Sequence, residues 1–556
     1  MASVTLSIAE LRELIGKPLE REKILNDLFE LGMDVEDVQG DNVTLEITPD
    51  RADLLCIEGI ARLLRSYYEI QPGLAIPRVR KSSYILHVER ELENIRPYIT
   101  GAIVKNLALD DKAIRSLMQV QEKLHATLGR KRKKGAIGVH DLDKISGRNI
   151  YYRAIDPESE RFIPLQKNMP MSPREILEKH EKGREYGYIL EGKSKVPVIY
   201  DEKELFSFPP IINARKTEVT EQTKAVLIEM TGEDQRTIDL MLNILLYMLE
   251  FRGGKIYSVK VRYHDRELIR PALGVKQMVV EVNYINKVLG LNLTQLEIKR
   301  LLERMGFGAS VVRNALRVKI PPYRTDILHR IDIVDDVGRA YGFNRIEPRY
   351  PPTLSIGNLT EQTKLSDAAR EVLIGLGFQD TLNFILIGKE ECYTKMNLDP
   401  SLDERIVEIE NPYSEQYTIM RSWLIPSLMI VLSHNTHRPY PQNICEIGIA
   451  AQLDENEETG VREEERIAAL LCSSDAGYNE IKAKLQALLY SFGFTLDQIK
   501  TEPVEHPSFI SGRAAQVILN GKAIGIIGEI HPQVLKNFKL EMPVAAFEIK
   551  LEALKS

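Results

Sequence analysis

Residues 321–348 read PPYRTDILHRIDIVDDVGRAYGFNRIEP, and part of this stretch occurs twice in the chain. Its P-x-R-x-D-[LI]-L pattern returns at residues 49–55. Upstream of the two patterns, Leu11 to Met33 and Ile285 to Phe307 align without gaps. Both segments predict a helix, a glycine stop, a second helix and a closing glycine. Chance leucine spacing between helices is the alternative, but the shared motif favours an internal repeat. The identical positions upstream are Gly16/Gly290, Leu19/Leu293, Ile24/Ile298, Leu28/Leu302 and Gly32/Gly306.

Length and composition set the class of protein. The 556 residues correspond to about three to four domains. Apolar residues make up 44% and charged residues 28%, which excludes a disordered chain. A net charge of -6 excludes a globally basic nucleic-acid coat but not a local basic patch. The four cysteines never form CxxC, and we see no signal peptide and no membrane span, so we expect a cytoplasmic protein.

Proline clusters divide the chain. Pro72 and Pro77 flank a linker, Pro271 follows a charged run, and residues 348–352 hold three prolines. Strand and helix patterns mix in every block, so we predict an α+β multidomain protein. The predicted blocks are 1–75, 80–265, 270–348 and 352–556. The predicted helices include Asp234 to Phe251 and Gln362 to Leu376, and the predicted strands include Gln277 to Val282 and Gln516 to Leu519.

The second copy carries an acidic cluster that the first copy lacks. Asp332, Asp335 and Asp336 are spaced i, i+3, i+4, so we expect them on one helix face. Such carboxylates repel one another, and Mg²⁺ is a hard cation that binds one or two carboxylates and keeps waters. The alternative is a solvated acidic helix start that the helix dipole favours. A separate stripe is expected to face the core: Ile331, Val334, Gly338 and Tyr341.

These motifs, preceded by the duplicated module, resemble the β subunit of phenylalanyl-tRNA synthetase in its short archaeal and eukaryotic form. The resemblance covers essentially the whole chain and rests on several long motifs in order. They are RKRKKGAIGVHDLDKI (130–145), FPPIINARKTEVTEQT (208–223), RGGKIYSV (252–259), ENPYSEQYTIMRSWLIPSL (410–428) and IGIIGEIHP (524–532).

The resemblance implies an α2β2 enzyme that joins phenylalanine to tRNA(Phe) using ATP and Mg²⁺. It implies a duplicated helical and wing module, an editing domain, and an antiparallel class II synthetase-like domain without activity. It places aminoacylation on the α subunit and none of the catalytic residues for that step on this chain. It also implies that four acids are metal ligands: Asp326, Asp332, Asp335 and Asp336.

In the family, the block at 80–265 hydrolyses tRNA mischarged with tyrosine. An apolar pocket rejects an analogue with one added hydroxyl by only about a hundredfold, so a second site is needed. The resemblance places pocket residues at Asn213, Glu229 and Thr231, with Glu229 accepting the phenolic proton. The alternatives are a turn residue for Asn213 and a helix N-cap for Thr231. We see no Ser-His-Asp order for a protein nucleophile, so attack by water is the preferred hypothesis.

Residues 130–134 form the only run of five positive charges. A solvated loop is the common meaning of such a run. Its place in a tRNA-handling block favours contact of Arg130, Lys131 and Arg132 with phosphate. The neighbouring His140-Asp141 pair suggests either acid/base work or a satisfied structural pair.

The last block lacks the arginines that ATP activation needs in class II synthetases. Arg513 is the only arginine in residues 499–556 of the sequence. The isolated Arg421 is expected to form a surface ion pair. We therefore expect this block to pack against the α subunit. Two alternatives remain for the whole chain: a purely structural assembly subunit without editing, and a free-standing RNA-binding protein.

Overall fold

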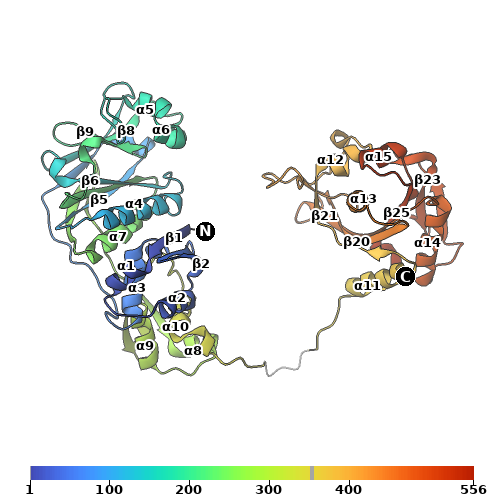
Figure 1. Cartoon of the computed structure of the whole chain (residues 1–556), viewed down its shortest axis with the longest axis horizontal. Helices are drawn as coiled ribbons and strands as arrows, with labels where there is room; N and C mark the ends of the chain where they lie inside the picture. The colour runs from blue at the N-terminus through green and yellow to red at the C-terminus, as the bar shows by residue number, and fades with distance from the viewer. Residues whose placement is uncertain (1, 351–355, 556) are drawn as a thin grey trace. The chain divides into compact units, whose positions relative to one another are not determined.

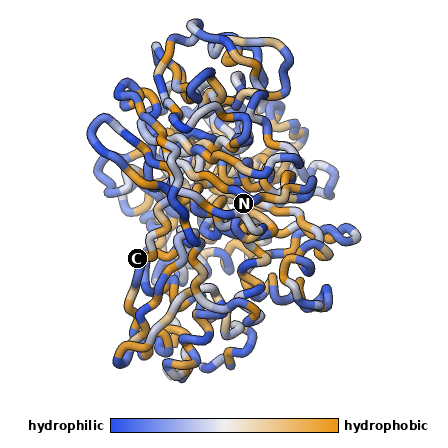
Figure 2. The backbone as a smooth tube through the Cα atoms, turned by 90° about the vertical axis from the view of Figure 1, so that its left-hand side faces the viewer, coloured by the Kyte–Doolittle hydropathy of each residue, from blue (hydrophilic) through white to orange (hydrophobic). Residues whose placement is uncertain are grey.

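The computed structural model describes residues 2–350 and 356–555. The chain divides into two compact units, Met1–Tyr350 and Pro351–Ser556, which are treated separately below (Figure 1). Two of the prolines predicted to mark this boundary, Pro351 and Pro352, lie outside the described residues. Hydrophobic and hydrophilic residues interleave along the chain (Figure 2). Among the described residues, no helix is both long enough and apolar enough to span a bilayer.

The first repeat copy is a small three-stranded sheet covered by three helices. The strand order is β1-β3-β2, and both pairings are antiparallel. Gly16 ends the first helix in the left-handed conformation, at φ 75°, as the glycine stop predicts. Its elements are β1 (Ala2–Ser7), α1 (Ile8–Ile15), α2 (Arg21–Glu30), β2 (Asp34–Gln39), β3 (Asn42–Ile47) and α3 (Ile57–Tyr67).

The second copy repeats this order and topology, which confirms the predicted repeat. Its sheet has the order β14-β16-β15, and Gly290 ends its first helix at φ 69°. The last helix of the first copy ends at Tyr67, and that of the second copy ends at Tyr341. Its elements are β14 (Lys276–Glu281), α8 (Val282–Leu289), α9 (Gln295–Arg304), β15 (Gly308–Val312), β16 (Ala315–Ile320) and α10 (Arg330–Tyr341).

The two copies pack against each other in a reciprocal way. Ser66 of α3 donates a hydrogen bond of 2.8 Å to the carbonyl oxygen of Glu303, at the end of α9. Arg339 of α10 donates one of 2.9 Å to the carbonyl oxygen of Leu31, just after α2. Each copy therefore caps carbonyl groups at the end of the other copy's second helix, and apolar residues of both copies share one core.

A ten-stranded sheet is inserted between the copies in sequence. Its order is β10-β9-β8-β7-β4-β12-β5-β11-β6, with β13 paired to β12. The strands are β4 (Ile85–Val88), β5 (Tyr98–Lys105), β6 (Gly135–Asp141), β7 (Asn149–Ile155), β8 (Val196–Tyr200), β9 (Leu205–Phe208), β10 (Ile212–Asn213), β11 (Ala225–Gly232), β12 (Lys255–Arg262) and β13 (Glu267–Arg270). The helices are α4 (Asp111–Ala126), α5 (Pro173–Lys179), α6 (Glu181–Tyr186) and α7 (Gln235–Phe251).

One face of α7 holds both linkers of this inserted sheet. The hydroxyl group of Tyr247 donates a hydrogen bond of 3.1 Å to the carbonyl oxygen of Ala75 in the first linker. Asn243, one turn earlier, donates one of 3.4 Å to the carbonyl oxygen of Ala272 in the second linker. The chain therefore enters and leaves the inserted sheet within about one helical turn of α7.

The second unit is built on a seven-stranded sheet of order β17-β20-β21-β25-β24-β23-β22. All pairings in it are antiparallel except that of β17 with β20. Its strands are β17 (Gln379–Asp380), β20 (Gln442–Leu453), β21 (Val461–Cys472), β22 (Ile499–Pro503), β23 (Phe509–Leu519), β24 (Lys522–Ile530) and β25 (Val544–Lys550). Two further strands, β18 (Leu386–Ile387) and β19 (Ile419–Met420), pair with each other in a separate two-stranded sheet. The helices are α11 (Glu361–Gly375), α12 (Lys389–Cys392), α13 (Ile425–His434), α14 (Tyr478–Ser491) and α15 (Pro532–Asn537).

The mixed α/β, multidomain character of the chain agrees with the sequence prediction. The predicted helices at 234–251 and 362–376 match α7 and α11 with shifts of one residue at their ends. The predicted strand at 277–282 matches β14, and the one at 516–519 is the end of the longer β23. Strong apolar periodicity therefore predicted these elements, and their exact bounds depend on caps and turns.

Candidate functional site

The acidic motif of the second copy surrounds an arginine. The guanidinium of Arg324 donates to Asp326 at 2.6 Å and to Asp336 at 2.7 Å. Arg324 and Asp336 are buried. Burial disfavours the charge on Arg324, but Asp336 and Asp326 outweigh it and raise the pKa of the guanidinium. Two of the four predicted metal ligands therefore pair with one guanidinium of the same motif, whose single positive charge offsets one of their two negative charges.

The other two aspartates point elsewhere. Asp332 accepts hydrogen bonds from the backbone N–H groups of Leu328 and His329 at the start of α10. Asp335 is exposed and pairs with Arg339 at 2.6 Å. Asp332, Asp335 and Asp336 lie within about one turn of α10, as their spacing predicts, but Asp336 is buried whereas Asp335 is exposed. The predicted core stripe is wrong for Ile331, which is exposed. The core-facing residues of α10 are instead Ile333, Val334, Val337, Gly338 and Ala340.

This arrangement does not fit a magnesium site made of the four aspartates. Mg²⁺ needs carboxylate oxygens directed at one point. Within residues 2–350 and 356–555, no group of three or more His, Cys, Asp or Glu side chains is placed to hold a metal ion. The physical reason is the Arg324 guanidinium, which already supplies positive charge to Asp326 and Asp336. Magnesium binding by these residues stays a prediction.

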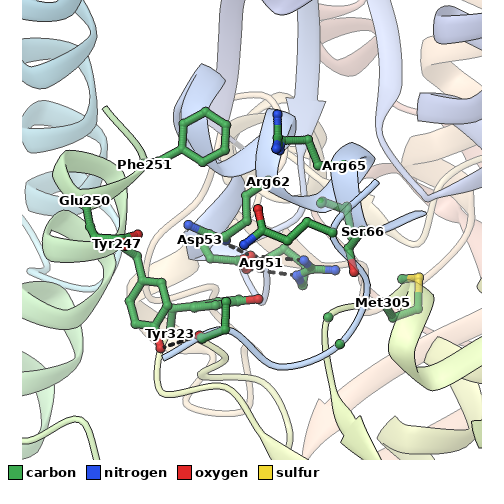
Figure 3. A pocket seen from close by; sticks show the side chains of 15 residues that line it. Arg51, Asp53, Arg62, Arg65, Ser66, Tyr247, Glu250, Phe251, Met305 and Tyr323 are labelled. Atoms are coloured by element: carbon green, nitrogen blue, oxygen red, sulfur yellow. Dashed lines mark hydrogen bonds and ion pairs between the residues drawn. The ribbon is translucent and has the colours of Figure 1, made fainter. Parts of the chain in front are cut away.

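The first copy holds a related cluster at the equivalent place. Arg51 donates two hydrogen bonds to Asp53, at 2.9 and 3.1 Å, and Arg62 lies 3.5 Å from the same carboxylate. Figure 3 shows Arg62 near Tyr323 and Tyr247, and its guanidinium lies 3.9 Å from the Tyr323 ring centre. Arg62 therefore contacts the first copy, the second copy and α7 of the inserted sheet.

A pocket of about 300 Å³ opens on the inserted sheet, a volume at the lower end of the range for small-ligand sites. Its walls come from α4, β6, β11 and the segment after β9. Asn213 and Glu229 both line it, so the structure brings together two of the three predicted editing residues. Apolar side chains make up much of the rest, among them Leu117, Ile137, Val139, Pro210 and Ile211.

Glu229 is a buried acidic group at the wall of this pocket. Its side chain is 3% exposed, and its Oε1 atom accepts a hydrogen bond of 3.2 Å from the Ser207 hydroxyl. Its Oε2 atom is buried and has no hydrogen-bond partner among the described residues. His140 Nε2 lies 3.7 Å from Oε1, beyond hydrogen-bond distance. A buried carboxylate oxygen without a partner is unfavourable, so this site is suited to a ligand that donates a hydrogen bond.

Thr231 lies apart from the pocket. It belongs to β11, is fully buried, and accepts a hydrogen bond of 2.9 Å from Arg96 Nε. The alternative N-cap role is wrong as well, because Asp234 caps α7 with its carboxylate. The predicted His140-Asp141 pair also separates: His140 Nδ1 bonds to Thr217, and Asp141 accepts from Thr223.

The basic run 130–134 is a tight loop with three left-handed residues. Arg130, Lys131 and Arg132 have φ values of 46°, 51° and 67°. Arg130 and Lys131 are exposed, which is compatible with the predicted phosphate contact. Arg132 is different: it is 8% exposed and donates to the carbonyl oxygens of Pro210 and Ile211. Its guanidinium supports the pocket, so this placement counts against phosphate contact by Arg132.

Sequence reasoning missed Ser207, Gly138 and Arg96. A Cβ at position 138 would lie 2.2 Å from Glu229 Oε1, so only glycine leaves room for this carboxylate. The buried Arg96 guanidinium donates to the carbonyl oxygens of Arg132 and Lys133 and thereby holds the basic loop. Gly138 lies between the apolar residues Ile137 and Val139 of β6, and a glycine inside such a strand is typical of a close approach.

In the second unit, Arg421 is buried rather than on the surface as predicted. It pairs with Glu446 at 2.8 Å and donates to the carbonyl oxygen of Ile449. Arg513 pairs with Glu529 at 2.6 Å. The buried Arg421 guanidinium is therefore fixed within the unit, whereas Arg513 is exposed and forms one surface ion pair.

Comparisons with known proteins cover the whole chain. Family models described as B3/4 domain, tRNA synthetase B5 domain and phenylalanyl tRNA synthetase beta chain CLM domain match residues 98–242, 278–343 and 346–551. The chain is 57% identical to the phenylalanine--tRNA ligase beta subunit of Methanocella arvoryzae and 44% identical to that of Haloarcula marismortui, in each case over 100% of both chains. A crystal structure of an N-terminal fragment of the phenylalanyl-tRNA synthetase beta subunit from Pyrococcus horikoshii is 39% identical, with a TM-score of 0.59. It covers 61% of this chain and 99% of the fragment.

Proposed function

The chain belongs to the family of phenylalanine–tRNA ligase beta subunits, and on that premise we propose two roles for it. It supports the ATP-dependent attachment of phenylalanine to tRNA(Phe) by an α subunit, in an α2β2 assembly. It also hydrolyses tRNA(Phe) that has been mischarged with tyrosine. The family membership supports the first role, and the pocket around Glu229 supports the second.

The unpartnered Oε2 atom of Glu229 is the observation that carries the editing proposal. A tyrosine side chain would place its ring against the apolar walls and donate its phenolic proton to Oε2. A phenylalanine side chain would leave that buried oxygen without a partner, which costs about 1–3 kcal/mol. The pocket therefore prefers tyrosine, the reverse of the preference that an apolar synthetic site has.

Hydrolysis requires an attacking group at the ester. Among the residues that line the described pocket there is no serine or cysteine, and the one threonine, Thr217, is buried with its hydroxyl bonded to His140 and to the Ala214 carbonyl oxygen. We therefore propose that water attacks the ester carbonyl. Glu229 and Asn213 then act as specificity residues that orient the substrate.

The second unit supports the view that adenylation takes place on the partner. Binding of a triphosphate needs guanidinium groups that are free to turn toward phosphate. Arg421 is held by Glu446 inside the unit, and Arg513 is held by Glu529. We propose that this unit has the class II synthetase-like fold without activity and packs against the α subunit.

The decisive experiment uses the complex of this chain with its α subunit. We expect Glu229→Ala to lower the rate of tyrosyl-tRNA(Phe) deacylation at least about tenfold, the range for a lost hydrogen bond to a charged group. Aminoacylation with phenylalanine should not change. Glu218→Gln is the matched control, because Glu218 lines the same pocket but is exposed.

The results separate the proposal from its alternatives. Aminoacylation without any deacylation of tyrosyl-tRNA would indicate a structural assembly subunit. Failure to form a complex with an α subunit, together with RNA binding by the chain alone, would indicate a free-standing RNA-binding protein.

A further inference from the structure

The Glu229 pocket has a second polar region, formed by the last turn of α4 and the basic loop. One face of α4 lines the pocket, and His125 lies on this face near the end of the helix. Arg132 of the basic loop also lines the pocket. Each side chain has a buried nitrogen atom without a hydrogen-bond partner among the described residues: Nδ1 of His125 and Nε of Arg132. These two atoms lack a partner in the same way as Glu229 Oε2.

The fold fixes the hydrogen atom of the His125 imidazole on Nδ1. β6 is the last strand of its sheet, and the backbone N–H of Ile137 in β6 donates a hydrogen bond of 2.8 Å to His125 Nε2. A nitrogen atom that accepts a hydrogen bond carries no hydrogen, so the neutral ring has its one hydrogen on Nδ1. Burial also lowers the pKa of His125, which keeps the ring neutral near pH 7. His125 Nδ1 and Arg132 Nε are therefore both donors.

Glu122 is an acidic side chain beside these donors. Its Oε1 atom lies 3.2 Å from Arg132 Nη2 but 3.9 Å from His125 Nδ1, beyond hydrogen-bond distance. The Nη1 atom of Arg132 donates to the carbonyl oxygens of Pro210 and Ile211, which leaves Nε without a partner. The side chain of Glu122 is 58% exposed, so it can turn toward solvent when a ligand approaches. The two donors are then available to an oxygen atom of that ligand.

The donors and the acceptor of the pocket meet at consecutive residues of β6. His125 binds the backbone of Ile137, and Glu229 packs against the next residue, Gly138, where a Cβ would lie 2.2 Å from Glu229 Oε1. A tyrosyl ester has a phenolic hydroxyl that donates a hydrogen bond and a carbonyl oxygen that accepts one. The unpaired atoms of the pocket are therefore complementary to both polar groups of this ligand.

We infer that His125 Nδ1–H and Arg132 Nε–H bind the ester carbonyl oxygen of tyrosyl-tRNA(Phe) and stabilise the oxyanion that forms during its hydrolysis. The inference rests on the proposed editing function. The oxygen of water forms a bond to the carbonyl carbon, and the π electron pair moves to the carbonyl oxygen, where the two donors bind it. When this pair returns, the bond to the ribose oxygen breaks. That oxygen leaves with one proton of the water, and the other proton is released when the product carboxyl group ionises.

The test compares two substitutions of His125 in the complex with the α subunit. In His125→Gln, the side-chain oxygen takes the place of Nε2 and can accept from Ile137, but the donor at the Nδ1 position is lost. In His125→Asn, the amide NH2 group takes the place of Nδ1, and the acceptor for Ile137 is lost. We expect His125→Gln to lower kcat for deacylation of tyrosyl-tRNA(Phe) about a hundredfold, with KM nearly unchanged. His125→Asn should lower kcat by no more than about tenfold, because it keeps the donor.

Hydrogen exchange separates this role from a structural one. Exchange of the segment around Ile137 should stay slow in His125→Gln and become faster in His125→Asn, which is the opposite of the order expected for the activities. His87→Gln is the matched control, because His87 belongs to the same sheet but does not line the pocket. We expect this control to keep the wild-type kcat.

The outcomes distinguish this inference from the proposed function. Wild-type activity of His125→Gln, a loss in His125→Asn as large as that in His125→Gln, or a loss confined to KM would overturn the role of His125 and leave the editing function in place. Absence of deacylation by the wild-type complex would remove the editing function itself, and this inference with it.

Discussion

The two repeat copies share their topology but invert the charge of their central cluster. In the first copy, one aspartate, Asp53, lies between the guanidiniums of Arg51 and Arg62. In the second copy, one arginine, Arg324, lies between the carboxylates of Asp326 and Asp336. The first cluster alone has one more positive than negative charge, and the second cluster alone has one more negative than positive charge. A duplicated framework can therefore keep buried charges when the copies balance each other, without any metal ion.

The largest effect is expected at the centre of the second cluster. Arg324→Met would leave Asp336 buried without a partner, and we expect the free energy of unfolding of the first unit to fall by about 3–5 kcal/mol. Arg51→Met should lower the free energy of unfolding by less, because Arg62 remains beside Asp53. The single tryptophan, Trp423, reports only on the second unit, so hydrogen exchange in α10 is the suitable measurement. Equal losses of unfolding free energy for Arg324→Met and Arg51→Met would show that the two clusters contribute equally to stability.

The next effect concerns the side chain that joins the copies to α7. Arg62→Gln removes the ion pair with Asp53 and the contact with the Tyr323 ring. We expect a loss of about 1–2 kcal/mol, seen as faster hydrogen exchange in α3 and in the second half of α7. If only α3 responds, Arg62 stabilises the first copy alone.

The first cluster should also be sensitive to acid. Burial raises the pKa of Asp53, but Arg51 and Arg62 outweigh it and hold the pKa below its usual value of about 3.9. The carboxylate therefore contributes stability that is complete above about pH 5 and is lost as the pH falls through the folded-state value. We expect the stability difference between wild type and Asp53→Asn to shrink from pH 5 to pH 3. A difference that is constant with pH would contradict this.

A small effect is expected for the aspartate that faces solvent. Asp335 pairs only with Arg339 on the same exposed helix face. We expect Asp335→Asn to change the free energy of unfolding by less than about 1 kcal/mol at 0.15 M salt. Urea titration followed by circular dichroism would measure this, and a loss as large as that of Arg324→Met would give Asp335 a role that its surroundings do not explain.

No effect is expected from magnesium on the chain alone. Because Arg324 pairs with both Asp326 and Asp336, we expect the melting temperature to be the same in about 5 mM MgCl2 and in EDTA. A magnesium-dependent stabilisation that Asp326→Asn removes would show that these carboxylates do hold a cation.

The repeat and the long elements were predictable from the sequence because they depend on local signals. Gly16 and Gly290 stop helices through their left-handed backbone, and apolar periodicity located α7 and α11. The buried ion pairs were not predictable in this way. The pairing of Arg324 with Asp336 spans twelve residues and depends on how α10 packs, which helix spacing alone does not determine.

The roles of the pocket residues were also only partly predictable from the sequence, because they too depend on tertiary packing. Glu229 and Asn213 line one pocket, but Thr231, two residues after Glu229, is bound by Arg96 instead. Arg132 belongs to a charged run, and only the fold shows that backbone carbonyl groups bind it. Charge density along a sequence thus indicates where cations are, but tertiary packing determines which of them can reach a ligand.

The hydrogen bonds from α7 to both linkers have a consequence for how this chain could be engineered. Tyr247 and Asn243 hold Ala75 and Ala272 on adjacent turns of one helix, so the inserted sheet begins and ends at nearly one point. Closing the host chain over so short a gap requires only a small loss of loop entropy, but α7 shares one core with both copies, so an exchange of the inserted sheet would have to keep α7 in place.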